Sequence, residues 1–200
     1  MNDPAYTIEC ARIQDTTAML KMEKNYFDNC WHSESKTIDK LIEQEPMMFR
    51  VCKVDEKVKG YYWVFPLEYS IWNQVITGEI DETEMVKHIK SFDDPDIYLY
   101  ISSVIVDQTD EQHKKYTKAL VYDFGRHFVL SRKQETPDIR AVGAFTISAG
   151  GRRLMERSDF SYQGSFKVSG TLVRSYAANR KTLVKQVITV RQKLMKKNIA

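Results

Sequence analysis

The chain has 200 residues, of which 42% are hydrophobic and 28% are charged, and its net charge is +3. These values are typical of a soluble globular protein of one domain and exclude a disordered or fibrous chain. No apolar run approaches the length of a membrane span and no basic-then-apolar leader opens the chain, so we expect a cytoplasmic protein without membrane contact. Cys10, Cys30 and Cys52 lack metal-site spacing, which favours reduced thiols over disulfides.

The charges are distributed unevenly along the chain. The last acidic residue is Asp159, and nine basic residues follow it. Residues 1–160 carry 21 basic and 27 acidic side chains and are therefore net negative by six charges. An acidic body with a basic tail bears on partners and self-association rather than on the fold.

The first part of the chain predicts one strand and two helices. Tyr6–Ile13 is the strand. Asp15 can cap a helix that runs to about Phe27. A second helix covers about Lys36–Gln44, and Pro46 ends it.

Two strands and an irregular insert follow. Met48–Val54 and Val58–Pro66 flank a short polar turn, which predicts an antiparallel hairpin. Within the insert, residues 67–97, Gly78 is typical of a helix stop. Asp81–Glu84 has the form of an Asp-led capping box that opens a short helix.

The stretch Tyr98–Leu120 reads as a buried strand, a polar loop and a helix. Tyr98–Val106 is rich in β-branched and aromatic residues, and Asp107–Asp110 is the loop. The N-terminus of a helix offers unpaired N–H groups and the positive end of the helix dipole to an anion. The alternative is a buried strand packed on a helix that begins with a solvated basic turn.

The last part of the chain predicts two more strand–helix units. The expected elements are a linker at Lys133–Pro137, a strand at Asp138–Phe145, a short helix at Ser148–Ser158, strands at Phe160–Val168 and Thr171–Tyr176, and a helix at about Arg180–Lys197. Mixed strands and helices in this order predict an α/β or α+β sandwich around one mixed, mostly antiparallel sheet.

The final helix is basic and amphipathic, with an apolar stripe of Leu183, Val187, Val190 and Leu194. We expect residues 1–178 to form one domain, with 179–200 packed on it or used for association. The alternatives for this tail are a homodimer or partner helix, and an arm that contacts nucleic acid. Nucleic-acid contact is not favoured, because the one aromatic residue near this tail is Tyr176, just before its start.

The order of elements resembles the GCN5-related N-acetyltransferase (GNAT) family over about residues 6–176. The central strand and helix stand where that family has its acetyl-CoA motif. Asp138–Phe145, Ser148–Leu154 and Arg157–Phe160 look like its later strand and helix. Gly60–Leu67 followed by Gly78–Ile80 is similar to an insert of bacterial members, so the chain resembles a divergent bacterial-type GNAT protein.

The chain departs from the family pattern at four positions. The family loop reads Gln/Arg-x-x-Gly-x-Gly/Ala, and an alignment on the leucine at position 120 puts Gln112 first and Lys115 and Thr117 at the glycines. Side chains there would hinder close approach of a cofactor. Met155 stands where many members have the tyrosine that protonates the thiolate, and Asp159 replaces a glycine.

The resemblance implies acetyl-CoA as co-substrate, an amine as acceptor and no metal. It implies that the backbone of Val104, Ile105 and Val106 pairs with the pantetheine arm. The implied phosphate contacts are Gln112, His113, Lys114, Lys115, Tyr116 and Thr117, and Ser148 stands where an asparagine or serine often lies. The four histidines, His32, His88, His113 and His127, have no metal spacing.

Candidates for the proton transfers are chosen by location. Tyr98, Tyr100 and Glu68 could accept the proton of the amine. The alternative for both tyrosines is core packing, because alternating strand residues share a face. Tyr162 and Tyr176 could supply the acid that Met155 cannot.

Two functional hypotheses follow. The first is an N-acetyltransferase that moves an acetyl group from acetyl-CoA to an amine of unknown identity. The second is a catalytically degenerate GNAT-fold protein that works as a binding or regulatory module without acyl-CoA chemistry. The lost glycines and Met155 motivate the second hypothesis.

Overall fold

The computed structural model describes residues 5–130 and 139–197, so the predicted linker at Lys133–Pro137 lies outside the described residues. Seven strands form a mixed, mostly antiparallel sheet in the order β1-β2-β3-β4-β5-β7-β6, which confirms the predicted fold class. The chain divides into two compact units. The first unit is Met1–Val64 with Ser102–Asp123, and the second is Phe65–Ile101 with Phe124–Ala200.

The strands of the first unit form an antiparallel ladder. They are β1 (Thr7–Cys10), β2 (Phe49–Val54) and the larger part of β3 (Lys57–Leu67). β1 pairs with β2, and β2 pairs with β3 through a two-residue turn. Both turn residues, Asp55 and Glu56, have positive φ, which suits the right-handed twist of a tight hairpin.

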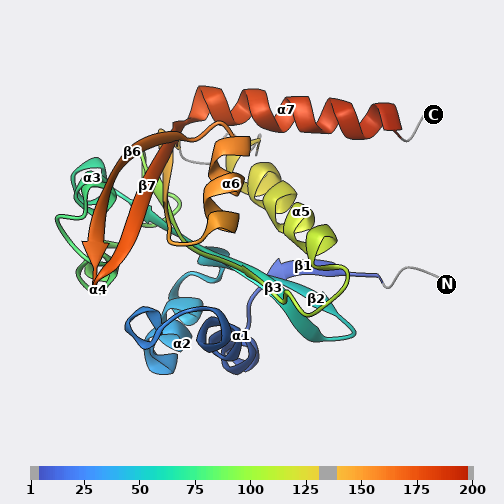
Figure 1. The fold of residues 1–200 in the computed structure, drawn as a ribbon, viewed down its shortest axis with the longest axis horizontal. Coiled ribbons are helices and arrows are strands. Elements are labelled where there is room, and N and C mark those ends of the chain that lie inside the picture. Colours follow the sequence, from blue (N-terminus) through green and yellow to red (C-terminus); the bar gives the residue numbers. More distant parts are fainter. Residues whose placement is uncertain (1–4, 131–138, 198–200) are drawn as a thin grey trace. The chain divides into compact units, whose positions relative to one another are not determined.

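Three helices cover this ladder. They are α1 (Ile13–Tyr26), α2 (Ser35–Gln44) and α5 (His113–Phe124), with 3₁₀ turns at Asn29–Trp31 and Pro46–Met48. Figure 1 shows α1 and α2 on one side of β1–β3 and α5 on the other. Side chains of opposite parity along β3 therefore meet different helices.

The start of α1 differs from the prediction by its capping geometry. Asp15 lies inside the helix as its third residue, and its Oδ2 accepts a hydrogen bond from the Arg12 N–H at 2.9 Å. The same oxygen lies 2.9 Å from Lys53 Nζ, and both side chains are buried. The Asp15 carboxylate thus caps the N-terminus of α1 and also forms an ion pair with β2.

A buried ion pair fastens α5 to the opposite side of the ladder. The Arg50 guanidinium donates two hydrogen bonds of 3.0 Å to the Asp123 carboxylate, and the Tyr62 hydroxyl donates a third of 2.8 Å. Burial and the Asp123 charge raise the pKa of Tyr62 well above its ordinary value. A bidentate pair with a third donor fixes the orientation of the helix on the strands.

The second unit holds the other half of the sheet. Its strands are the first four residues of β4 (Tyr98–Val106), then β5 (Ala141–Thr146), β6 (Ser161–Val168) and β7 (Thr171–Asn179). β4 and β5 are parallel in register from Tyr98–Ala141 to Ile101–Ala144, whereas β7 pairs antiparallel with both β5 and β6.

The helices of the second unit confirm most of the sequence signals. They are α3 (Tyr69–Thr77), α4 (Glu82–Met85), α6 (Ala149–Arg157) and α7 (Arg180–Lys197), with a 3₁₀ turn at Val86–His88 and a π-helical turn at Gly125–Val129. Gly78 ends α3 with a φ of 78°, and Asp81 Oδ1 accepts the Glu84 N–H at 2.8 Å.

Two close approaches at glycines position helices in this unit. A Cβ on Gly143 of β5 would clash with Ile76 Cδ1, so α3 packs directly on that strand. A Cβ on Gly125 would lie 2.7 Å from Val187 Cγ2, which places α7 against the π-helical turn. Leu183 of the predicted stripe is buried. The side chains of Val190 and Leu194 lie outside the described residues.

Candidate functional site

The end of β4 in the first unit carries the backbone expected to meet a pantetheine arm. Val104 is half-buried, whereas Ile105 and Val106 are buried. Gly60 of β3 lies so close that a Cβ there would be 2.9 Å from the Ile105 carbonyl oxygen. The Asp107 N–H then donates to the Lys59 carbonyl at 2.9 Å. β3 therefore holds the strand end in place just before the loop.

The loop between β4 and α5 is organised by its own carboxylates. Asp107 Oδ1 accepts hydrogen bonds from the Thr109 N–H at 3.0 Å and the Thr109 hydroxyl at 2.6 Å. Asp110 Oδ1 accepts the Gln112 N–H at 2.9 Å. A backbone donor at the start of α5 is thus already satisfied by an internal anion.

Lys59 completes this arrangement from β3. Its Nζ lies 2.8 Å from Asp110 Oδ2 and 3.9 Å from Asp107 Oδ2, and its side chain is half-buried. The hydrogen bond from Lys59 lowers the pKa of Asp110 most, and the hydrogen bond from the Gln112 N–H lowers it next. The bond to Asp110 likewise raises the pKa of Lys59. The Lys59 ammonium and the backbone N–H at the start of α5 therefore both bind the Asp110 carboxylate.

The predicted phosphate contacts form the first turns of α5. The Gln112 carbonyl accepts the N–H groups of Lys115 at 2.8 Å and Tyr116 at 3.2 Å, and the Thr117 hydroxyl donates to the His113 carbonyl at 2.9 Å. Tyr116 is buried. Lys115 and Thr117, which stand at the glycine positions, are helical residues rather than loop residues.

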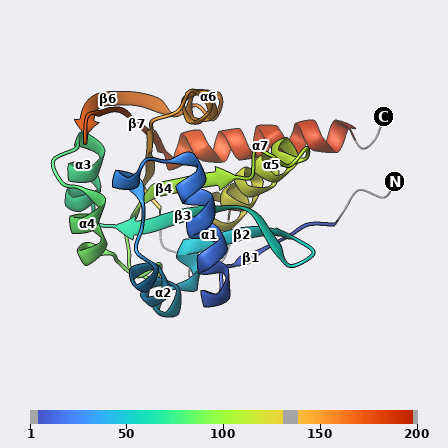
Figure 2. The ribbon, with the colours of Figure 1, turned by 60° about the horizontal axis from the view of Figure 1, so that its bottom comes forward.

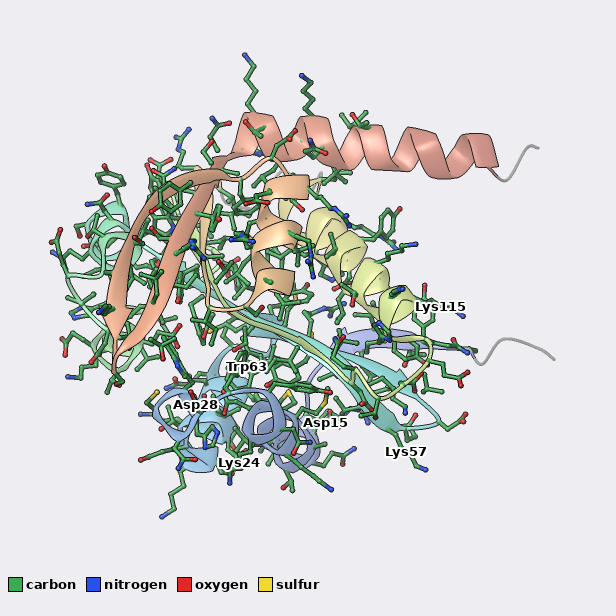
Figure 3. The ribbon with its side chains drawn as sticks, in the orientation of Figure 1. Asp15, Lys24, Asp28, Lys57, Trp63 and Lys115 are labelled. Atoms are coloured by element: carbon green, nitrogen blue, oxygen red, sulfur yellow. The ribbon has the colours of Figure 1, made fainter. Side chains whose placement is uncertain are left out.

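The two lysines of this turn differ in exposure. Lys114 is exposed and Lys115 is half-buried. Lys115 Nζ lies 5.4 Å from the centroid of the Tyr6 ring and 3.4 Å from Gln112 Oε1. Figure 3 shows Lys115 at the N-terminal end of α5. Its charge is therefore close to the turn where the GNAT resemblance implies phosphates.

The remaining candidates lie in the second unit. Ser148 is exposed and caps α6, since its Oγ accepts the Gly151 N–H at 3.0 Å. Tyr100 is fully buried, and its hydroxyl donates to Glu82 Oε1 at 2.5 Å. Burial is the main influence that raises the pKa of Tyr100 well above its ordinary value. Tyr100 thus has the geometry of the core-packing alternative.

The other proton-transfer candidates differ in their surroundings. Tyr98 is half-buried, with its ring centroid 5.2 Å from that of Trp72. Glu68 is exposed and accepts a hydrogen bond from the Ser70 hydroxyl. Tyr162 and Tyr176 are cross-strand partners on β6 and β7 with centroids 5.8 Å apart. Tyr162 is exposed and Tyr176 is buried.

Solved structures share this arrangement of elements. The loading GNATL domain of CurA from Lyngbya majuscula matches with a TM-score of 0.68 at 10% identity, covering 88% of this chain and 98% of that chain. Ard1 from Thermoplasma volcanium matches with a TM-score of 0.58 at 14% identity, covering 88% and 97%.

A third structure, the GphF GNAT-like decarboxylase in complex with isobutyryl-CoA, matches with a TM-score of 0.61 at 11% identity, covering 87% of this chain and 99% of that chain. The chain has the GNAT fold. No family model and no curated protein matches the sequence. At these identities the similarity establishes the GNAT architecture and leaves the activity to the residues.

The structure shows the surroundings of two residues that depart from the GNAT pattern, Asp159 and Met155. Asp159, at the glycine position after α6, has a φ of 56°, which is the left-handed region that favours glycine. Its carboxylate accepts a hydrogen bond from Gln186 of α7. Met155 is buried in α6 and offers no proton.

The residue that the tertiary fold brings to the loop has no local signal in the sequence. Lys59 is an alternating polar position of a predicted strand, and no local spacing links it to Asp110.

Within the described residues, no group of three His, Cys, Asp or Glu side chains is placed to hold a metal. In the same part of the chain, no helix combines the length and apolarity needed to cross a bilayer.

Proposed function

We propose that this protein is an acyl-CoA-dependent N-acyltransferase that moves an acetyl group from acetyl-CoA to an amine. The observation that carries the proposal is the GNAT fold, in which β4 leads through the loop at residues 107–112 into α5. The isobutyryl-CoA bound by GphF supports a CoA thioester as donor. The cytoplasmic location and bacterial origin suggested by the sequence stay predictions.

The fit to CoA differs between its two ends. Backbone groups of Val104–Val106 suit the pantetheine arm, because pairing there does not depend on side-chain type. The phosphate end fits only when Asp110 gives up its bonds to Lys59 and to the Gln112 N–H. Lys59 would then pair with phosphate, together with Lys115 and the backbone of Gln112–Thr117.

The chemistry supplied by the donor is a thioester carbonyl that an uncharged amine attacks, with a thiolate as leaving group. The chain must take a proton from the amine and give one to the sulfur. Tyr98 and Glu68 stay candidates for the first task. Tyr100 does not join them, because it is buried and its hydroxyl is bonded to Glu82. Tyr162 and Tyr176, which are cross-strand partners, stay the candidates for the second task.

Calorimetric titration with acetyl-CoA and with free CoA tests the proposal. We expect micromolar binding by the wild type. Lys115→Glu should weaken it about tenfold, which corresponds to about 1.4 kcal/mol, because a phosphate would meet a carboxylate. Lys118→Glu, an exposed charge reversal further along α5, is the matched control. Equal affinities for wild type and Lys115→Glu would remove the phosphates from this turn.

A second candidate function is a GNAT-fold binding or regulatory module without acyl-CoA chemistry. The internal capping of α5 by Asp110 favours it, because a fixed carboxylate repels phosphate. A folded wild type that binds neither CoA ligand would support this alternative. In the same titration Asp110→Asn should bind CoA more tightly than the wild type if the phosphates compete for this position.

A further inference from the structure

The first unit contains buried polar groups that have no hydrogen-bond partner. Three of these groups are Thr16 Oγ1, Tyr61 Oη and Trp63 Nε1, on side chains with relative exposures of 2%, 0% and 2%. Buried hydroxyl and indole N–H groups in native proteins are nearly always bonded to protein or water. Three unpartnered groups on two facing elements therefore indicate a polar occupant.

These groups lie on one side of the ladder. Tyr61 and Trp63 are two residues apart on β3 and their rings stack, with centroids 5.1 Å apart. Thr16 belongs to the buried face of α1 together with Glu23, seven residues later. Figures 2 and 3 show α1 crossing β3 and Trp63 on the side of β3 that α1 covers. The β3–α1 polar cluster is defined here as Thr16, Glu23, Tyr61 and Trp63.

Glu23 gives the β3–α1 polar cluster its charge. The side chain has a relative exposure of 2%, and its two oxygens accept hydrogen bonds from the Ser33 N–H at 2.8 Å and the Ser33 hydroxyl at 3.0 Å. Among the described side chains none forms an ion pair with Glu23. Burial is the first cause of its raised pKa, while Ser33, His32 and Lys24 act in the opposite direction. A buried carboxylate without a counter-ion is costly, and a bound cation relieves that cost.

The charge of Glu23 also affects the hydroxyl of Tyr61. Burial raises the pKa of Tyr61 well above its ordinary value, and the nearby Glu23 charge adds to the rise. Tyr61 is therefore a neutral hydroxyl with acceptor capacity to spare. The indole of Trp63 is a donor only. The cluster thus offers one anion, two aromatic side chains, two hydroxyl groups and one indole N–H donor.

We propose that the β3–α1 polar cluster binds the acceptor amine of the proposed acyl transfer, as a small primary ammonium with a neighbouring hydrogen-bond acceptor. Glu23 is its counter-ion, Tyr61 Oη accepts an N–H, and Trp63 Nε1 donates to the neighbouring oxygen. The inference rests on the proposed function for the fate of the amine, and the binding itself does not depend on it.

Entry requires movement of the segment between α1 and α2. Ser33 holds this segment to Glu23, and His32 Nε2 shares a hydrogen bond of 2.9 Å with the Phe27 carbonyl. Asn29 and Cys30 of the intervening turn are exposed, and Trp31 Nε1 has no partner. An ammonium group that takes over the Ser33 bonds would leave the carboxylate satisfied.

The test is a two-dimensional NMR titration of the whole chain with small probes and no acetyl-CoA. The probes are glycinamide, which has an amine and a carbonyl, propylamine, which lacks the carbonyl, and acetamide, which lacks the amine. We expect glycinamide to bind more tightly than propylamine, with acetamide causing no saturable shift. Glu23→Gln should weaken glycinamide binding about tenfold or more through loss of the charge.

Matched variants separate binding from folding. Glu34→Gln removes one exposed carboxylate from the same segment and should bind like the wild type. Trp63→Phe keeps the ring and removes the N–H, so it should abolish the preference for glycinamide over propylamine. Equal glycinamide affinity in the wild type and Glu23→Gln overturns the proposal. Absence of amine binding in the folded wild type also overturns it and leaves buried water as the occupant.

The outcome is distinguishable from that of the acyl-transfer proposal. Amine binding with no acetyl-CoA binding would support the amine site and defeat the acyltransferase function. Acetyl-CoA binding without amine binding at the β3–α1 polar cluster would support the acyltransferase function and defeat the amine site. The acceptor would then bind elsewhere.

Discussion

At the scale of single residues, the loop before α5 shows how a charged side chain decides what a helix N-terminus can bind. Asp110 accepts a hydrogen bond from one backbone N–H and pairs with one ammonium group, and the ion pair depends on its ionised form. Helix N-termini bind anions in general. Here the first anion is part of the chain, so any phosphate must compete with it.

Asp110→Asn tests this at the level of stability. The pKa of Asp110 is lowered in the folded state, so its ion pair stabilises the protein above the unfolded pKa and is lost as pH falls through the folded pKa. Asn keeps the acceptor for the Gln112 N–H and loses the charge. We expect a cost of roughly 0.5 kcal/mol at pH 7, because the pair is partly exposed.

Urea unfolding at pH 7 and pH 3 measures this cost. The difference between wild type and Asp110→Asn should shrink at the lower pH. Glu111→Gln removes a charge from the exposed neighbour and is the control. A difference that stays constant across this pH range would show that the ion pair does not contribute as argued.

At the scale of elements, the hairpin turns of the two units use the same backbone conformation with different residues. The β2–β3 turn places Asp55 and Glu56 at φ of 48° and 59°. The β6–β7 turn places Ser169 and Gly170 at φ of 48° and 84°. A side chain in this region is strained, so Glu56 stores strain that Gly170 avoids.

Glu56→Gly and Gly170→Ala should therefore shift stability in opposite directions. The first should stabilise by up to about 1 kcal/mol, since release of strain exceeds the added freedom of the unfolded chain. The second should destabilise by about 1 kcal/mol, although a Cβ on Gly170 would have nothing within 4 Å. The denaturant midpoints of the two variants, compared with that of the wild type, measure these shifts in stability. Shifts of the same sign would contradict the strain argument.

The packing of β3 against the end of β4 gives a second prediction at this scale. A Cβ on Gly60 would lie 2.9 Å from the Ile105 carbonyl oxygen and 2.9 Å from Val106 Cγ2. Gly60→Ala should cost roughly 1–3 kcal/mol through overpacking, and it should disturb amide signals of residues 104–106 in NMR spectra.

Gly164→Ala is the control for this prediction, because a Cβ on that strand glycine would have nothing within 4 Å. A fully stable Gly60→Ala variant with unshifted signals at 104–106 would mean that the strand end adapts more easily than its close contacts suggest.

At the scale of the whole molecule, the basic tail is an element of the second unit. Leu183 is buried, and Val187 lies over Gly125 at the end of the α5 segment. This is the geometry expected of a helix docked on its own chain. Association through the tail stays a proposal, because the tail's charge favours acidic partners whether or not its apolar side is covered.

Deleting residues 180–200 tests the tail. The segment holds seven basic and no acidic residues, so the net charge changes from +3 to −4. We expect the melting temperature to fall by about 5 °C or more through lost packing, with the oligomeric state in size-exclusion chromatography unchanged. Full-length Leu183→Ala should reproduce part of the loss. An unchanged melting temperature with a lost dimer would assign the helix to association.

Local features of this protein could be predicted from sequence because each depends on neighbours along the chain. Gly78 ends a helix through its own φ, and Asp81 caps the next helix three residues ahead. The GNAT order of elements is a property of the same local signals taken in sequence. Asp15 does cap its helix, from the third helical position, and its carboxylate also pairs with Lys53 on a distant strand, which no local signal indicates.

What only the tertiary structure decided is which charges and polar groups meet. Lys59 lies beside Asp110, and Glu23 lies near Tyr61, across wide gaps in the chain. No period of 2 or 3.6 residues encodes such pairs, since they arise only when a helix crosses a strand. The amino-acid sequence by itself determined the elements, the GNAT resemblance and the charge asymmetry. The crossing of α1 and α5 over opposite sides of β3 decided the chemistry of the two candidate sites, because burial and proximity set the charge of each group.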